Sequence, residues 1–176
     1  LIRAYTAFLT ASQALFETFG AIADPYMSLV GYFNSLRELG GMRRLAEDDV
    51  RTRCYRVAMS LIHRPGLAQR GLSDLVAELT SRVPSAKIPE YLDQLELQFG
   101  EEFDEERGKF KTRWDEGLRP IDVVLATNML SVGVDVNRLG LMVVNGQPKG
   151  TAEYIQATSR VGRSFLVLIV SFNFGS

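Results

Sequence analysis

The sequence predicts an α/β protein in which a parallel β-sheet is flanked by helices, with an extra helix at the N-terminal end. Two short apolar runs, residues 123–126 and residues 139–144, are rich in β-branched side chains and bounded by polar residues, as is typical of buried strands. A polar turn separates the two runs, and a helix that Thr151 is expected to cap follows the second. In such sheets, ligands bind outside the carboxyl ends of the strands.

Residues 1–23 are predicted to form an amphipathic helix. It carries a single cation, Arg3, and so lacks the basic face of a membrane-surface helix. We expect it to pack against this domain or against a neighbouring one. Asp24-Pro25 ends it, which predicts an N-terminal helix over residues 1–24 and one α/β domain over residues 25–176. The apolar positions at helical spacing are Leu1, Tyr5, Phe8, Leu15, Phe19 and Ile22.

A strand over residues 28–33 ends at Asn34-Ser35, where either residue can cap the next helix. That helix is expected over residues 35–63, with a break or kink at residues 40–41. Its charge pattern is compatible with a rim that faces nucleic acid and with a solvated, salt-bridged face, and the second interpretation is favoured. The cations are Arg43, Arg44, Arg51, Arg53, Arg56 and Arg64, and the anions are Glu47, Asp48 and Asp49.

The remaining elements are predicted in the same way. A strand in the second half of residues 75–83 ends in a polar turn, and Ser85 is expected to cap a helix over residues 88–99. An acidic run and a basic run over residues 101–113 indicate an exposed connection or helix, and residues 165–174 are a further strand-like run. The aromatic side chains expected to pin the charged segment are Phe103, Phe110 and Trp114.

Composition limits the kinds of site that the chain can hold. Its 176 residues carry a formal net charge of −1, so a nucleic-acid site would have to be local. Cys54 and His63 are the only residues of their kinds, which argues against a disulfide framework and against cysteine- or histidine-based metal sites. A lone cysteine fits a reducing cytoplasm, and no apolar run reaches the roughly 18 residues of a membrane span. We expect a cytoplasmic protein with no membrane partner and, because the sequence opens on Leu1-Ile2 without Met, a fragment of a longer one.

Two arginines near the end of the last predicted helix, Arg160 and Arg163, have the chemistry of an anion site. Residues at i and i+3 lie on one helical face, so both can address one anion. Arginine stays charged and donates from a planar fork, which suits the charge that develops on a γ-phosphate during phosphoryl transfer. Gly162 between them allows close approach of backbone or ligand. Taken alone, the pair is more simply interpreted as solvated cations at a helix end.

Three segments resemble the motifs of a known family. ATNMLSVGVDV (residues 126–136) resembles motif V of superfamily 2 helicases, and QATSRVGR (residues 156–163) resembles motif VI, Q-x-x-x-R-x-G-R. YFNSLREL (residues 32–39) resembles motif IV. All three belong to the second RecA-like lobe, and the stretch from residue 133 to residue 163 is similar to large bacterial DISARM-type phage-defence helicases. The resemblance covers residues 25–163, implies a RecA-like sheet, and favours the anion-site interpretation of the arginine pair.

The resemblance also implies two sets of site residues. Groups at the carboxyl ends of the strands would contact the nucleic-acid backbone; they are Asn34, Ser35, Thr80, Ser81, Arg82, Thr127 and Asn128. The nucleotide-facing residues would be Gly133, Asp135, Gln156, Arg160 and Arg163, with Arg160 and Arg163 as catalytic arginine fingers. From the residues alone, residues 34–35 can be an ordinary helix cap and residues 133–135 a turn in which glycine takes a positive φ.

The sequence contains no G-x-x-x-x-G-K-[ST] phosphate loop and no acidic box for magnesium. The resemblance therefore implies that ATP and Mg²⁺ are held mainly by the first RecA-like lobe of the same protein, and that this chain alone does not hydrolyse ATP. Other expected partners are nucleic acid, with DNA favoured, and further defence-system proteins. The alternative is a non-catalytic RecA-like module that binds nucleic acid or protein, against which the intact motif VI argues. A Rossmann-type enzyme would need a G-x-G-x-x-G motif, and none is present.

Overall fold

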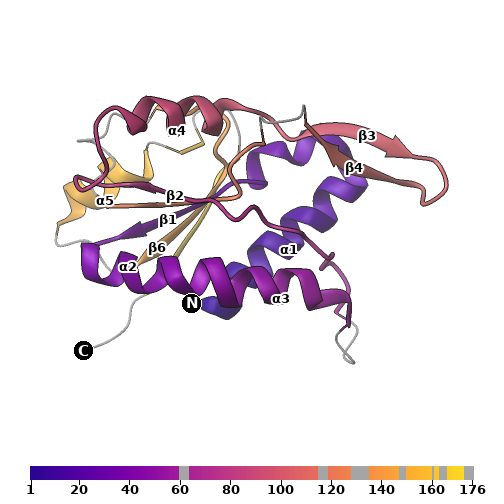
Figure 1. Cartoon of the computed structure of the whole chain (residues 1–176), viewed down its shortest axis with the longest axis horizontal. Coiled ribbons are helices and arrows are strands. Elements are labelled where there is room, and N and C mark those ends of the chain that lie inside the picture. The colour runs from indigo at the N-terminus through magenta and orange to yellow at the C-terminus, as the bar shows by residue number, and fades with distance from the viewer. Residues whose placement is uncertain are drawn as a thin grey trace.

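The structure is a computed structural model that describes residues 1–59, 64–114, 119–127, 135–146, 150–159, 161–162 and 166–172. Figure 1 shows the chain. The helices are α1 (Ile2–Phe19), α2 (Leu36–Leu45), α3 (Arg51–Arg56), α4 (Lys87–Glu96) and α5 (Thr151–Thr158), with 3₁₀ segments η1 (Gly20–Tyr26) and η3 (Val57–Met59) and a π-helical segment η2 (Ala46–Val50). The strands are β1 (Leu29–Phe33), β2 (Val76–Leu79), β3 (Gly100–Asp104), β4 (Lys109–Arg113), β5 (Val123–Ala126), β6 (Leu141–Asn145) and β7 (Leu168–Phe172).

Five strands form one parallel sheet in the order β2-β5-β1-β6-β7. The central strand is β1, in which Tyr32 lies opposite Ala126 of β5 and Phe33 lies opposite Asn145 of β6. On the outer side of β5, Leu79 of β2 is also opposite Ala126. Because the strands are parallel, their last residues lie along one border of the sheet, which we call the carboxyl edge. The turns after the strands therefore meet there.

Helices cover both faces of the sheet, as expected for parallel strands that are apolar on both sides. In Figure 1, α4 lies above the sheet, and α2 and α3 lie below it. Neighbouring residues of β5 show the division. Val124 belongs to a core cluster with Leu95 of α4 and Ala157 of α5, whereas Val123 belongs to a second cluster with Leu9 of α1. The predicted α/β fold, a RecA-like parallel sheet flanked by helices, is confirmed.

Helix α1 packs directly on the sheet. Tyr5 and Leu9 are fully buried beside the strands. A Cβ atom at Gly31 of β1 would clash with the Tyr5 hydroxyl and approach Leu125, so glycine at this position lets the helix lie close to the strand. The sequence predicted that this helix packs against its own domain or against a neighbouring one, and in the structure it packs against its own domain.

The apolar face predicted for α1 was wrong in part. Leu15, Phe19 and Ile22 are exposed, and the buried side instead includes Leu9 and Phe16. Apolar residues surround most of this helix, so their spacing alone does not select one face. The α-helix also ends at Phe19, earlier than predicted, and the chain continues as the 3₁₀ segment η1.

The charged segment after α4 forms a β-hairpin, so the helical alternative was wrong. Strands β3 and β4 pair antiparallel, with Phe103 opposite Phe110 and Glu102 opposite Lys111. The Lys111 Nζ lies 3.0 Å from Glu102 Oε1, so the acidic run is neutralised across the ladder by the basic one. Phe110 packs against a third core cluster, beneath α1 and η1, whereas Phe103 is exposed. Phe110 therefore holds the hairpin to the body of the domain.

Three further predictions about the helices, one kink and two N-caps, differ from the structure. Helix α2 runs unbroken through residues 40–41, and the irregular turn comes later, in η2. Glycine costs only about 1 kcal/mol relative to alanine inside a helix, which packing can offset. The N-caps of α4 and α5 are Ala86 and Gly150, and no side chain caps either helix, so Ser85 and Thr151 do not have the predicted role.

Two buried ion pairs join the segments at the opposite, amino border of the sheet. The Arg138 Nε donates to Asp24 Oδ2 at 2.9 Å, and the Arg70 Nη2 donates to Asp122 Oδ1 at 2.8 Å. Both guanidinium groups lie over the ring of Phe99, at 5.6 Å and 5.4 Å from its centroid respectively. Sequence reasoning missed this network, because each pair joins residues far apart in the chain.

Candidate nucleic-acid and nucleotide interface

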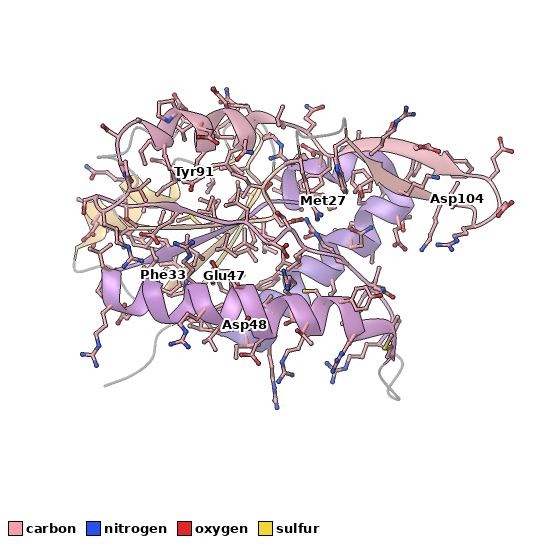
Figure 2. The ribbon with its side chains drawn as sticks, viewed as in Figure 1. Met27, Phe33, Glu47, Asp48, Tyr91 and Asp104 are labelled. Carbon is pink, nitrogen blue, oxygen red and sulfur yellow. The ribbon has the colours of Figure 1, made fainter. Side chains whose placement is uncertain are left out.

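The carboxyl edge gathers the turns that carry the predicted nucleic-acid residues. Asn34 and Ser35 follow β1, residues 80–82 follow β2, and Thr127 follows β5. Since β5 pairs with both β1 and β2, the three turns lie on adjacent strands. This edge is at the left of Figure 1, and Figure 2 labels Phe33, the last residue of β1, at the same end of the sheet. Asn128, predicted to follow Thr127 in this interface, lies outside the described residues.

Ser35 is the N-cap of α2, as one of the two sequence interpretations proposed. Its Oγ accepts a hydrogen bond from the Glu38 N–H at 3.3 Å. The positive end of the helix dipole is thereby directed to the carboxyl edge. Asn34 is exposed beside it, and a Cβ atom at Gly146 would lie 2.9 Å from the Asn34 Nδ2. Gly146, at φ 84°, therefore allows the end of β6 to approach the motif IV turn.

A buried carboxylate, Glu78, organises the turn after β2. Its side chain is only 4% exposed. The Thr80 Oγ1 donates to Glu78 Oε1 at 2.6 Å, and the Arg82 Nη2 donates to Oε2 at 2.8 Å. The Arg82 Nε donates to Oε1 as well, and the Arg43 Nη1 approaches Oε2 at 3.4 Å. Sequence reasoning missed Glu78, although a carboxylate inside a short buried strand is itself a signal of a bound cation.

This arrangement defines what the turn offers to a ligand. Thr80 is buried, its hydroxyl is committed to Glu78 and its carbonyl accepts from the Val83 N–H, so at most its backbone N–H remains for an outside partner. The Arg82 side chain is 46% exposed, and guanidinium N–H groups that Glu78 does not use point away from the buried carboxylate. Ser81 is exposed. Arg82 and Ser81 can therefore contact a phosphate while Glu78 holds the guanidinium in place.

The charge state of Glu78 follows from its surroundings. Burial alone would raise the pKa of its carboxyl, but hydrogen bonds from Arg82 and Thr80, together with the charges of Arg82 and Arg43, outweigh burial and lower that pKa below 4.5. The hydrogen bond from Arg82 to Glu78 in turn raises the pKa of Arg82. Both groups are thus ionised at neutral pH.

A hollow of about 730 Å³ lies at the carboxyl edge between α2 and the ends of β1 and β6. Its lining includes Phe33, Ser35 and Asn145. Asn145 is buried, and its Nδ2 donates to the Tyr5 hydroxyl and to the Tyr32 carbonyl, each at 3.0 Å. Burial raises the pKa of Tyr5, although the hydrogen bond with Asn145 acts in the opposite direction. Sequence reasoning assigned no role to Asn145, which links α1 to two central strands.

Three members of the nucleotide-facing set, Gly133, Arg160 and Arg163, lie outside the described residues. Gln156 is exposed on α5, and Asp135 is exposed ahead of β6. The described Gly162 has φ 72°, in the left-handed region, and its N–H donates to the Leu139 carbonyl at 2.7 Å.

The backbone conformation of Gly162 gives a further reason for glycine, because a φ of 72° disfavours any residue with a Cβ. The sequence suggested that glycine here allows close approach of backbone or ligand, and the Gly162 N–H lies 2.7 Å from the Leu139 carbonyl. The hydrogen bond to Leu139 ties the end of motif VI to the segment before β6. The motif VI helix is also joined to the central strand, because the Tyr32 hydroxyl donates to Glu153 Oε1 of α5 at 2.9 Å.

Within the described part of the chain, no group of three or more His, Cys, Asp or Glu side chains could hold a metal ion. Across the same residues, none of the helices is both long and apolar enough to cross a membrane. The polar groups described at the carboxyl edge are hydroxyls, amides and arginines around one neutralised carboxylate. These groups suit an anionic ligand, and they provide no carboxylate cluster of the kind that binds Mg²⁺.

Comparison with known proteins agrees with the fold. Residues 103–165 match the family described as the helicase conserved C-terminal domain. The parallel sheet and this match make the chain similar to the C-terminal domain of helicases.

Over 173 residues, the chain is 47% identical to the DISARM protein DrmA of Bacillus paralicheniformis (strain ATCC 9945a / NCIMB 11709 / CD-2). That alignment covers 97% of this chain and 14% of the length of the relative. The resemblance to the second RecA-like lobe of helicases, and to DISARM-type proteins among them, is confirmed.

Proposed function

We propose that this chain is the second motor lobe of an ATP-dependent superfamily 2 helicase or translocase. In this proposal Arg160 and Arg163 are arginine fingers, and the residues of the carboxyl edge contact the nucleic-acid backbone. The observation that carries the proposal is the anchoring of Gly162 to Leu139, because it ties the chain between the two arginines to the segment that leads into β6. Ser35 and Arg82, the arginine that Glu78 orients, both lie at the carboxyl edge of the sheet.

The proposal divides the work between two lobes. ATP and Mg²⁺ would be held mainly by the first RecA-like lobe of the same protein, which supplies the phosphate loop and metal-binding carboxylates that this sequence lacks. On this lobe, Gly133, Asp135 and Gln156 would border the nucleotide. Bound Mg²⁺ would neutralise charge on the phosphates. Closure of the lobes would bring the two arginines to the γ-phosphate, where planar, permanently charged groups stabilise developing charge.

On the nucleic-acid side, the proposed contacts are made to phosphates and carry no base specificity. Asn34, Ser35, Thr127 and Asn128 would provide hydroxyl and amide groups, and the helix dipole of α2 would favour the anion. The turn after β2 would contribute through Ser81, the Arg82 guanidinium and the backbone N–H of Thr80. DNA is the proposed polymer.

Similarity to a DISARM protein favours a place in phage defence, with other proteins of such a system as partners and a cytoplasmic location. We keep the division into an N-terminal helix, residues 1–24, and a RecA-like domain, residues 25–176, as part of the proposal. The burial of Tyr5 against β1 implies that the helix and the domain fold together.

The competing function is a RecA-like module that binds nucleic acid or protein without ATP hydrolysis. The two are separated by measuring ATP hydrolysis by the protein that carries this chain, with and without single- and double-stranded DNA and RNA. The motor proposal predicts hydrolysis that nucleic acid stimulates. Nucleic-acid binding with no hydrolysis on any of these polymers would favour the binding module, whereas stimulation by RNA alone would replace DNA as the polymer.

A further inference from the structure

A second hollow, of about 440 Å³, lies between α1, α3 and the turn that begins at Arg64. The described residues of its lining are small or apolar apart from four arginines and one threonine, and none of them is acidic. We call it the arginine hollow, and its polar lining residues are Arg3, Arg53, Arg56, Arg64 and Thr6. The four cations come from three segments that are separate in the sequence. A concentration of like charge is unusual in a chain with a net charge of −1.

Two of these arginines, Arg53 and Arg56, share the α2–α3 helical stretch with arginines that are paired. Arg43 is paired with Glu47 at 2.9 Å, and Arg51 is paired with Asp74. Within the described part of the chain, the arginines of the hollow are exposed and form no ion pair. Among the described residues, the basic run therefore holds paired arginines and exposed ones without an ion pair, and two of the latter, Arg53 and Arg56, line the hollow. Asp48 and Asp49 line the adjoining hollow with two of these arginines, and they do not line the arginine hollow itself.

The backbone around the arginine hollow is held in place before any ligand binds. Arg64-Pro65-Gly66-Leu67 has the sequence of a type II turn, with Gly66 at φ 83° and the Leu67 N–H donating to the Arg64 carbonyl at 3.4 Å. The chain then binds α1 through the Ala68 N–H and the Thr10 carbonyl, at 3.0 Å. Two residues further on, it binds α3 through a backbone hydrogen bond of 3.1 Å to the Cys54 carbonyl. The three basic segments are thus fixed relative to one another.

Thr6 provides a second, independent sign of a ligand. Its Oγ1 is buried and has no hydrogen-bond partner among the described residues, a state that normally costs about 1–3 kcal/mol. Threonine adopts two side-chain rotamers in helices, so rotation can direct this hydroxyl toward the hollow that the residue lines. A phosphate oxygen there would accept the hydrogen bond.

We propose that the arginine hollow binds the phosphate backbone of nucleic acid, at a place separate from the carboxyl edge. None of the described lining residues is an aromatic side chain on which a base could stack, which favours contact with phosphates and hence binding without sequence preference. The helical stretch from Ser35 to Arg56 is about 30 Å long at 1.5 Å per residue, so the two sites lie at opposite ends of it. Figure 1 shows this stretch running the length of the sheet, from the start of α2 to the end of α3.

This inference rests on the proposed function, because a second backbone contact would hold nucleic acid that the motor also engages. The test measures the affinity of the protein that carries this chain for a 30-base-pair DNA and a 30-nucleotide strand across 50–200 mM salt. Arg53→Ala/Arg56→Ala is compared with the control Arg44→Ala/Arg107→Ala, which removes the same charge from exposed arginines outside both sites. Arg3→Ala/Arg64→Ala is a second variant from other segments of the hollow, and thermal melting verifies that every variant folds.

The proposal predicts about tenfold weaker binding for each hollow variant, on either DNA, and a salt dependence whose slope falls by about 2, one for each lost phosphate contact. The control should match wild type. If both hollow variants bind DNA with wild-type affinity and slope, while Ser35→Ala/Ser81→Ala at the carboxyl edge weakens binding, the arginine hollow is not a nucleic-acid site and the proposed function stands. If no protein binds DNA, the inference about the hollow fails, and the proposed function then stands only if RNA stimulates ATP hydrolysis. Binding of pyrophosphate is measured on the same proteins. If the hollow variants lose pyrophosphate binding but bind DNA like wild type, the hollow is a site for small phosphates and the inference is overturned.

Discussion

Glu78 and Arg82 are joined by two hydrogen bonds at the carboxyl end of β2, of which the bond from Arg82 Nη2 to Glu78 Oε2 is 2.8 Å long. The carboxylate is buried and the guanidinium is nearly half exposed. A buried anion therefore sets the direction of a cation at the surface. We infer that Glu78 is a positioning residue for the proposed nucleic-acid interface and does not itself contact the polymer.

The first prediction concerns the pH dependence of the Glu78 cluster. Because the folded pKa of Glu78 is lowered, its ionisation stabilises the fold above about pH 4.5, and this contribution is lost as pH falls through the folded pKa. Glu78→Gln should lower the free energy of unfolding by about 1–2 kcal/mol at pH 7, since both arginine partners are partly exposed. Urea unfolding from pH 7 to pH 3 measures this. The difference from wild type should shrink below pH 4.5, and a constant difference would refute the assignment. Glu47→Gln, in a more exposed pair, is the control.

The second prediction concerns the buried pair of Arg138 and Asp24 at the amino border. Arg138→Met leaves the Asp24 carboxylate buried without its partner, and we expect the free energy of unfolding to fall by about 3–5 kcal/mol. Arg107→Met, at an exposed position in the hairpin, should change it by no more than about 0.5 kcal/mol. Denaturant unfolding of the two variants provides the comparison. Equal stability of both would show that the network is dispensable.

The third prediction separates backbone conformation from chemistry in motif VI. Gly162→Ala forces a residue with a Cβ into φ 72°, at a cost of roughly 1–2 kcal/mol, or shifts the chain between the two arginines. We expect ATP hydrolysis to fall at least tenfold while nucleic-acid binding is kept, as measured by turnover and by affinity on the same preparation. Gly71→Ala, where a Cβ would meet nothing within 4 Å, should leave both unchanged. If ATP turnover is unaltered in Gly162→Ala, the backbone conformation of this glycine is not needed for the reaction.

The fourth prediction uses the single cysteine as a probe of the fold. Cys54 is fully buried, and burial, partly offset by the charge of Arg70, raises its pKa to about 12. The native protein at pH 8 should therefore resist alkylation by iodoacetamide, while the protein in 6 M urea should react within minutes. Mass spectrometry of the alkylated fraction gives the result. Rapid modification under native conditions would contradict the packing of α3 on the sheet.

Comparison of the sequence with the structure shows which features depend on local pattern. Strands β1, β5 and β6 were predictable because each is an apolar run that ends at a polar turn. The end of such a run shows that Asn34 or Thr127 follows a strand, without knowledge of the fold. The order of the strands then brings those turns together. The parallel sheet and its carboxyl edge were therefore predicted before the packing was known.

The features that were missed depend on partners distant in the chain. Arg138 and Asp24 are 114 residues apart, and no spacing rule connects them. Tyr32 and Glu153, 121 residues apart, are joined only once α5 lies over the sheet. The arginine hollow likewise requires α1, α3 and the turn at Arg64 to meet, and the sequence shows only a basic run interrupted by acids.

The central claim is that motif VI supplies an arginine finger, and one measurement tests it most directly. The nucleic-acid-stimulated ATP turnover of the protein that carries this chain is compared between wild type and Arg163→Ala, with ATP affinity and melting temperature measured in parallel. We predict that the variant folds and binds ATP, and that its turnover falls by about 10³-fold or more. Hydrolysis by Arg163→Ala at the wild-type rate would contradict the account, because the alignment of motif VI and the role of its arginine would then both be wrong.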